Sequence, residues 1–222
     1  MKKFLSILFV TGMVSLPLVA SAETPAPKEK NEEHDALEVA IHGGLALPIG
    51  GVKTWYDSVG AKTGVNTGFD VGYYLDQQYV LGLSFNYAQF AIDSRAGLSS
   101  QHHRVYSPAF FLKRYFPSES NFAPYLLVRA GIDFPKFSTF VYDVQTPKYR
   151  ELSYSPNFSF TIGAGAHYYT SDFSGIYVEA GYHMAFTKHS ETDYQNRNFK
   201  FGQRVGMIDL RAGIVAFFGS SK

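Results

Sequence analysis

The chain has 222 residues and a formal net charge of +1, so it lacks the excess of positive charge that marks nucleic-acid-binding proteins. It contains no cysteine, which excludes disulfide bonds and thiolate metal sites. Its 20 Phe, 16 Tyr and 20 Gly are typical of β-structure and of membrane-interface belts rather than of helices.

The first 36 residues are predicted to lie outside the fold. Two lysines precede an apolar run from Phe4 to Ala20, which ends in the small-residue pattern Ala20-Ser21-Ala22. This pattern predicts a secretory signal peptide over residues 1–22, removed after its last alanine. A membrane anchor is the alternative, but the run is short for a span of about 20 residues and contains Pro17. Residues 23–36 are charged and proline-containing, so we expect a flexible periplasmic leader.

Eight segments after this leader alternate apolar and polar residues with a period of two, which predicts β-strands. In chain order they cover residues 37–46, 66–75, 79–90, 105–116, 123–134, 158–168, 176–184 and 207–218. No segment with a helical period separates them, so we expect antiparallel strands joined by hairpin connections. The connections after the second, fourth and sixth segments are short and the others are long. This arrangement predicts an up-and-down barrel.

The long third connection, residues 135–157, has a partial alternation of its own in Phe137, Thr139 and Val141. It predicts that the fifth and sixth strands project beyond the membrane as a hairpin. An exposed edge on that hairpin could pair with a strand of a partner.

Two kinds of eight-stranded barrel fit this pattern: a soluble lipocalin-like barrel with the apolar row inside, and a membrane barrel with that row facing lipid. Apart from its charged residues, the polar row is mostly Gly, Ala, Ser, Thr and Asn, which suits a narrow lumen better than a solvated surface. Phe and Tyr gather near strand ends, as interfacial girdles do. We therefore predict an all-β, eight-stranded antiparallel up-and-down transmembrane β-barrel over residues 37–218, followed by a short tail, 219–222.

Over residues Leu37–Phe218 the chain resembles the OmpA/OmpX/OmpW-type eight-stranded outer-membrane barrels of Gram-negative bacteria. The resemblance lies in the strand pattern and not in a diagnostic motif. It implies a location in the bacterial outer membrane, insertion by the barrel-assembly machinery and both termini in the periplasm. Such proteins usually end on an aromatic residue, whereas here Phe218 is followed by four more residues.

The charged residues of the polar row are predicted to lie in the lumen, which side chains fill in a barrel of eight strands. They are Glu38, Asp70, Arg129, Asp133, Glu179, Asp209 and Arg211. Because an unpaired buried charge is costly, we expect the two arginines to be ringed by the acids other than Asp133. The group could form an ion path or a structural network, and we favour the network.

The same row contains Lys113, although both rows of its segment carry aromatic residues, and three histidines, His42, His167 and His183. We expect the histidines to be hydrogen-bonded lumen residues rather than metal ligands. The sequence predicts no cofactor, no metal site and no catalytic residue.

The long connections carry more basic than acidic residues and are candidates for contact with lipopolysaccharide phosphates. The candidate contacts are Lys188, Arg197, Lys200 and Arg204, although a scattered solvated face fits equally well. We predict a monomeric, non-enzymatic envelope or surface protein whose partners are outer-membrane lipids and lipopolysaccharide. OmpW-like passage of small or hydrophobic molecules is the alternative. A lipid A-modifying enzyme, with His189-Ser190-Glu191 or the segment from Asp93 to His103 as candidate groups, is the third possibility.

Overall fold

The computed structural model describes residues 37–49, 60–93, 102–116, 118, 120–142, 147–153, 155–192 and 198–219. The predicted signal peptide, the leader and residues 220–222 lie outside them. The described residues form strands joined by turns, and none of them belongs to a helix able to cross a membrane.

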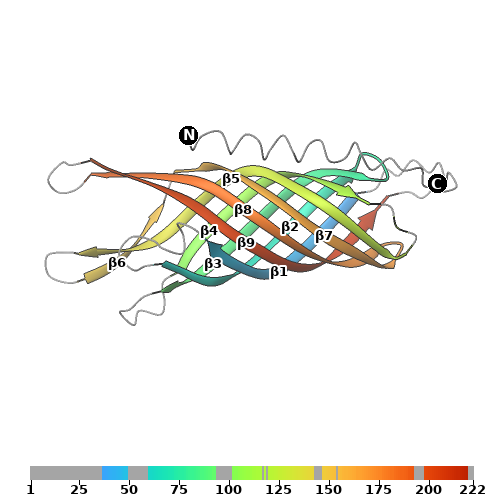
Figure 1. Ribbon diagram of the computed structural model, residues 1–222, viewed down its shortest axis with the longest axis horizontal. Coiled ribbons are helices and arrows are strands. Elements are labelled where there is room, and N and C mark those ends of the chain that lie inside the picture. The colour runs from blue at the N-terminus through green and yellow to red at the C-terminus, as the bar shows by residue number, and fades with distance from the viewer. Residues whose placement is uncertain are drawn as a thin grey trace, which may run out of the picture. The chain divides into compact units, whose positions relative to one another are not determined.

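Eight strands close into an antiparallel barrel, as predicted, and a ninth strand, β6, lies outside it (Figure 1). The strands are β1 (Leu37–Ile49), β2 (Gly60–Tyr74), β3 (Tyr79–Asp93), β4 (His102–Tyr115), β5 (Phe122–Tyr142), β6 (Pro147–Ser153), β7 (Asn157–Ser171), β8 (Ser174–Thr192) and β9 (Asn198–Phe218). Each barrel strand pairs with its neighbours in the chain, except that β5 is followed in the barrel by β7. The first and last strands close the wall from Leu37↔Phe218 to Ile49↔Gly206.

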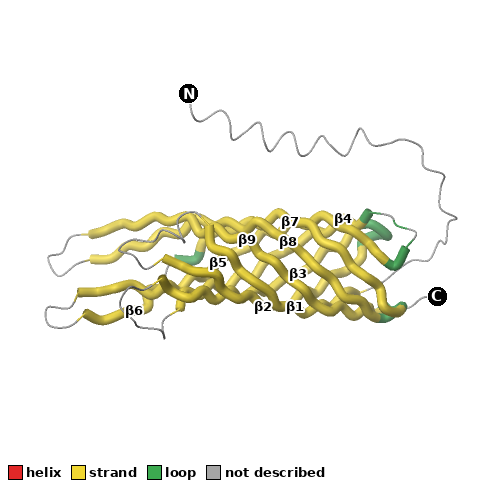
Figure 2. The backbone as a smooth tube through the Cα atoms, turned by 60° about the horizontal axis from the view of Figure 1, so that its bottom comes forward, coloured by secondary structure: helices red, strands yellow, loops and turns green. Residues whose placement is uncertain are grey.

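Two two-stranded ribbons extend beyond one end of the barrel (Figures 1 and 2). One consists of β6 and the last part of β5, residues 136–142, which confirms the predicted hairpin. The other consists of residues 186–192 of β8 and 198–204 of β9, and the sequence did not predict it. We call this the ribbon end. The opposite end, where β1 begins and β9 ends, has the turns after β2, β4 and β7, and we call it the short-turn end.

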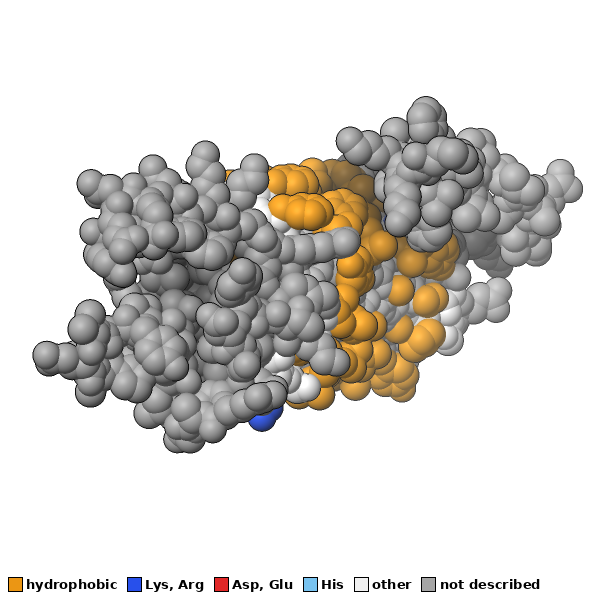
Figure 3. Space-filling view, turned by 60° about the vertical axis from the view of Figure 1, so that its left-hand side comes forward, with side chains coloured by type: hydrophobic (Ala, Val, Ile, Leu, Met, Phe, Trp, Pro, Cys, Tyr) orange, Lys and Arg blue, Asp and Glu red, His pale blue; other side chains and the backbone are white. Residues whose placement is uncertain are grey.

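The apolar row faces outward, as expected of a membrane barrel. Ile41, Phe110 and Val178 are 55%, 67% and 60% exposed, whereas Glu38 and Asp70, on the other row, are fully buried. On the face that the space-filling view shows, apolar side chains form a band across the barrel wall (Figure 3). Lipid is the environment that such a band requires.

The pairing of β4 with β5 is interrupted, and the β2–β3 and β7–β8 pairings shift register between Ala61 and Gly64 and between Tyr169 and Ser171. Pairing runs from Arg104↔Lys136 to Tyr106↔Phe134 and resumes at Ala109↔Gly131 in the same register. Pro108 lies in this gap, and proline has no amide hydrogen to donate to a ladder. The interruption spans only two residues on each strand, with paired residues on both sides.

Candidate functional site

The barrel lumen contains a continuous network of buried ion pairs contributed by six strands. Its seven charged members are Glu38, Asp70, Lys113, Arg129, Glu179, Asp209 and Arg211. All seven are buried. In strand order they come from β1, β2, β4, β5, β8 and β9, so the network ties opposite sides of the wall together.

Lys113 and Arg129 form the centre of this network. The Lys113 ammonium contacts the Glu38 carboxylate and lies 3.8 Å from Asp70 Oδ2. Arg129 donates from Nη1 to Glu179 Oε1 at 2.7 Å and from Nη2 to Asp70 Oδ2 at 3.1 Å. Asp70 therefore connects the two cations.

Arg211 extends the network toward the ribbon end. Its Nη2 donates to Asp209 Oδ2 at 2.8 Å, and its Nη1 lies 3.6 Å from Glu179 Oε1. The Asn66 amide donates to Asp209 Oδ1 at 2.9 Å. Neutral groups donate further hydrogen bonds to the carboxylates of the network. The Tyr125 hydroxyl, for example, donates to Glu179 Oε2 at 3.1 Å.

The sequence placed these side chains in one lumen but assigned one pairing differently. Glu38 was expected beside an arginine, yet it contacts Lys113 and accepts from the Tyr115 hydroxyl at 3.0 Å. Lys113 was not included in the expected network, because the aromatic residues on both rows of its segment obscured the pattern. Asp133, for which no arginine partner was expected, pairs with His183.

Asp133, His183 and Thr161 form a separate hydrogen-bonded group on the ribbon side. His183 Nε2 lies 2.8 Å from Asp133 Oδ2, and its Nδ1 lies 2.9 Å from Thr161 Oγ1. A hydroxyl, an imidazole and a carboxylate joined in this order also occur in hydrolytic enzymes, where they act as the nucleophile, the general base and the acid that orients the base. All three are buried, and the adjoining cavity of about 10 Å³ has room for about one water molecule. Sequence reasoning missed this group; pairing β7 with β8 as a hairpin, which places Thr161 opposite His183, was the signal that could have found it.

An aromatic layer fills the lumen at the short-turn end. The His167 ring lies 5.1 Å from Tyr125 and 5.3 Å from Tyr115, measured between ring centroids. Phe111 packs in the same layer, and Gly82 leaves room for it, because a Cβ there would lie 2.6 Å from the ring. Sequence reasoning assigned aromatic residues to the membrane interface and did not foresee this inner layer.

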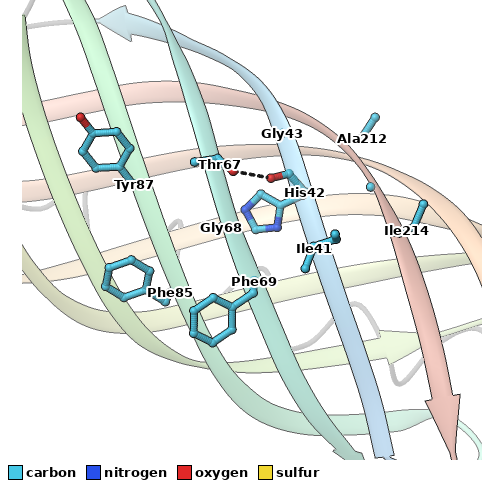
Figure 4. A pocket seen from close by; sticks show the side chains of 11 residues that line it. Ile41, His42, Gly43, Thr67, Gly68, Phe69, Phe85, Tyr87, Ala212 and Ile214 are labelled. Carbon is cyan, nitrogen blue, oxygen red and sulfur yellow. Dashed lines mark hydrogen bonds between the residues drawn. The ribbon is translucent and has the colours of Figure 1, made fainter.

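The outer wall carries a shallow apolar depression of about 660 Å³ over β1, β2, β3 and β9 (Figure 4). Its sides include Ile41, Phe69 and Phe85, and small residues such as Gly43 lie at its floor. Thr67 Oγ1 donates to the His42 carbonyl oxygen at 2.9 Å, so this hydroxyl is satisfied. The depression faces the lipid side and has the apolar character that acyl chains fill.

Several predicted residues cannot be placed in a site. Arg197 lies outside the described residues, as do residues 94–101, and for Lys188, Lys200 and Arg204 only the backbone in the β8–β9 ribbon is described. The same holds for His189-Ser190-Glu191. His103 is buried, which removes it from the polar loop in which it was expected. Over the described ranges, no group of three or more His, Cys, Asp or Glu side chains is arranged to hold a metal ion.

Comparison with known proteins identifies the family. Residues 14–204 match the family described as outer membrane protein beta-barrel domain. The chain belongs to this family. A search of curated proteins gave no match.

Solved structures show the same fold. Neisserial surface protein A is 16% identical, with a TM-score of 0.53, and the match covers 82% of this chain and 99% of that one. The outer membrane protein OprG from Pseudomonas aeruginosa is 13% identical, with a TM-score of 0.50 and coverage of 84% and 98%. At such identities the likeness extends to the fold alone.

Proposed function

We propose that this barrel is a non-enzymatic protein of the bacterial outer membrane that acts at the cell surface through its two ribbons. The observation that carries the proposal is the packed lumen. The ion network and the aromatic layer fill it, and the cavity beside Arg129 and Arg211 measures only about 10 Å³. A signal peptide of the predicted kind would bring such a chain to the periplasm, where barrel-assembly machinery could insert it.

The ribbons supply the surface for this role. Within the described residues β6 pairs with β5 alone, so its second edge presents backbone donors and acceptors to solvent. An extended segment of a partner can add to such an edge, and the side chains then decide specificity. This mode of binding needs no pocket and no reaction.

Lipopolysaccharide is the partner that we propose for the second ribbon. Lys188 and Lys200 both lie in the β8–β9 ribbon, where their register partners are Gly202 and Ser190. Arg204 lies closer to the barrel, opposite Phe186. Together with Arg197 they would meet the phosphates of the outer leaflet, because anionic surfaces attract clustered Lys and Arg.

Binding of the purified barrel to vesicles with and without lipopolysaccharide tests this function. The double variant Lys188→Gln/Lys200→Gln should bind lipopolysaccharide vesicles roughly thirtyfold more weakly, since each basic residue near an anionic surface contributes about 1 kcal/mol. Lys62→Gln/Lys136→Gln removes the same number of positive charges from β2 and β5, outside this ribbon, and is the matched control. Equal binding to both kinds of vesicle, or equal weakening by the control, would contradict the proposal.

Passage of small or hydrophobic molecules is the second candidate, and the observation that favours it is the interruption of the wall at Pro108. A lateral route would open there between β4 and β5. Uptake of a hydrophobic dye by cells with and without the chain tests it. Equal uptake would remove this candidate.

A lipid A-modifying activity is the third candidate, favoured by the order of Thr161, His183 and Asp133. Against it, these three side chains are buried in the lumen rather than placed at the lipid surface. Mass spectrometry of lipid A from cells with and without the chain decides the matter. Unchanged lipid A would exclude the enzyme.

A further inference from the structure

The short-turn end of the barrel contains a vestibule of about 370 Å³ that the lumen network does not occupy. It is lined by Tyr74, Gln77, Tyr169, Ser171, Asp172 and Phe217. These residues come from the ends of β2, β7 and β9 and from the turns after β2 and β7. The vestibule is therefore built by chain segments on two sides of the barrel mouth.

Three aromatic rings form the walls of this vestibule at an angle to one another. The Phe217 ring lies 5.4 Å from Tyr169 and 6.5 Å from Tyr74 between centroids, with interplanar angles of 46° and 59°. These distances are those of aromatic rings packed against one another, so a ligand in the vestibule would contact their open faces and edges and would not lie between them. The faces of Phe and Tyr carry negative potential and attract a cation within about 6 Å of the centroid.

The charge around the vestibule is negative. Asp172 lies exposed at its rim, and among the described lining residues there is no Lys, Arg or His. Beneath it, the Tyr74 hydroxyl donates to Glu38 Oε2 at 3.3 Å. Glu38 is itself paired with Lys113, so the exposed Asp172 is the charged group that the described lining offers to a ligand. An exposed carboxylate with no basic residue among the described lining residues favours a positive group at the mouth.

We propose that the vestibule binds an organic ammonium group, such as one end of an aliphatic diamine or polyamine. The ammonium and its first methylenes would lie in the vestibule against the open faces of these rings, and the Asp172 carboxylate would pair with the charge. The Gln77 carbonyl and the Ser171 hydroxyl are further acceptors for its N–H groups. A bare divalent metal ion fits less well, because Mg²⁺ and Ca²⁺ require several oxygen ligands and ring faces supply none.

The test uses the full barrel in uncharged maltoside micelles, titrated with 1,5-diaminopentane and followed by NMR of the tyrosine rings. We expect saturable shifts with one site per barrel, and no saturable shift with 1,5-pentanediol, which has the same chain length without charge. Asp172→Asn and Phe217→Leu should each weaken binding between about twofold and fivefold, the range of an exposed cation–π or ion-pair contact.

Asp76→Asn is the matched control, because Asp76 is an exposed acid of the turn after β2 at the same end but does not line the vestibule. Its Oδ1 accepts from the Gln78 and Tyr79 amides, a role that asparagine retains. No saturable shift, equal shifts with the diol, or equal weakening by Asp76→Asn and Asp172→Asn would overturn the proposal. If Phe217→Leu fails to fold, Asp172→Asn still decides the outcome. The vestibule lies at the opposite end from the ribbons, so this result is independent of the proposed surface function.

Discussion

Arg129 is the cation of the lumen network that makes close ion pairs with two buried carboxylates at once. It donates to both Glu179 and Asp70. Arg129→Met should therefore lower the free energy of unfolding by about 3–5 kcal/mol, the usual cost of breaking a buried pair from one side. Urea unfolding of the refolded barrel in micelles measures this change.

Arg114→Met is the control for that experiment. Arg114 comes from the same barrel, but it lies over the Tyr79 and Phe116 rings at 5.8 and 5.5 Å instead of among the lumen acids. Its replacement should cost no more than about 1 kcal/mol. Similar losses for both variants would contradict a special role of the lumen pairs.

Two glycines of the lumen row differ in the space around them. A Cβ at Gly82 would lie 2.2 Å from the backbone oxygen of Val71, whereas at Gly181 the nearest atom would be Thr161 Cγ2 at 3.2 Å. Gly82→Ala should destabilise the barrel by about 1–3 kcal/mol, because backbone has to move. Gly181→Ala should cost less than about 1 kcal/mol. Thermal unfolding followed by circular dichroism compares them, and equal effects would refute this account of the glycines.

At the scale of the elements, the barrel wall and the ribbons are separable. β5 pairs with β7 from Phe122 to Asp133 and with β6 only from Lys136 onward. Replacing residues 138–151 with an Asn-Gly turn should therefore leave the barrel folded, with the free energy of unfolding changed by less than about 1 kcal/mol. Urea unfolding of the shortened chain measures this, and failure to fold would show that the β5–β6 ribbon supports the wall.

The strands within the wall could be predicted from the sequence, and those of the second ribbon could not. In the wall, lipid on one side and a packed lumen on the other impose a strict period of two, as in Ile208, Leu210 and Ile214 against Asp209 and Arg211. In residues 186–192 and 198–204, Lys, His and Ser interrupt that period. β8 and β9 consequently extend farther than their predicted segments.

Pairing across the lumen was harder to predict than strand position. The alternation of apolar and polar residues predicts which side chains point into the lumen. It does not predict the level along the barrel axis at which a residue of one strand meets a residue of a strand across the lumen. Glu38 meets Lys113 because β1 and β4, separated by two strands, bring them to the same level. The alternation within one sequence does not indicate this relative level of distant strands.

At the scale of the whole molecule, a lumen filled by charged and aromatic side chains should not conduct ions. We expect planar bilayers containing the barrel to show no single-channel steps at neutral pH, while an open porin in the same bilayer shows them. Regular conductance steps would contradict the packed lumen.

The closing contact between β1 and β9 has a consequence for how the barrel assembles. Leu37 pairs with Phe218, so the seam joins the two ends of the folded chain. The ion network spans the same seam, since Glu38 lies on β1 and Arg211 on β9. A sheet inserted one strand at a time would place unmatched charges and bare backbone in hydrocarbon, both of which are strongly unfavourable. Membrane entry and barrel closure should therefore be a single cooperative event, completed only when the last strand arrives.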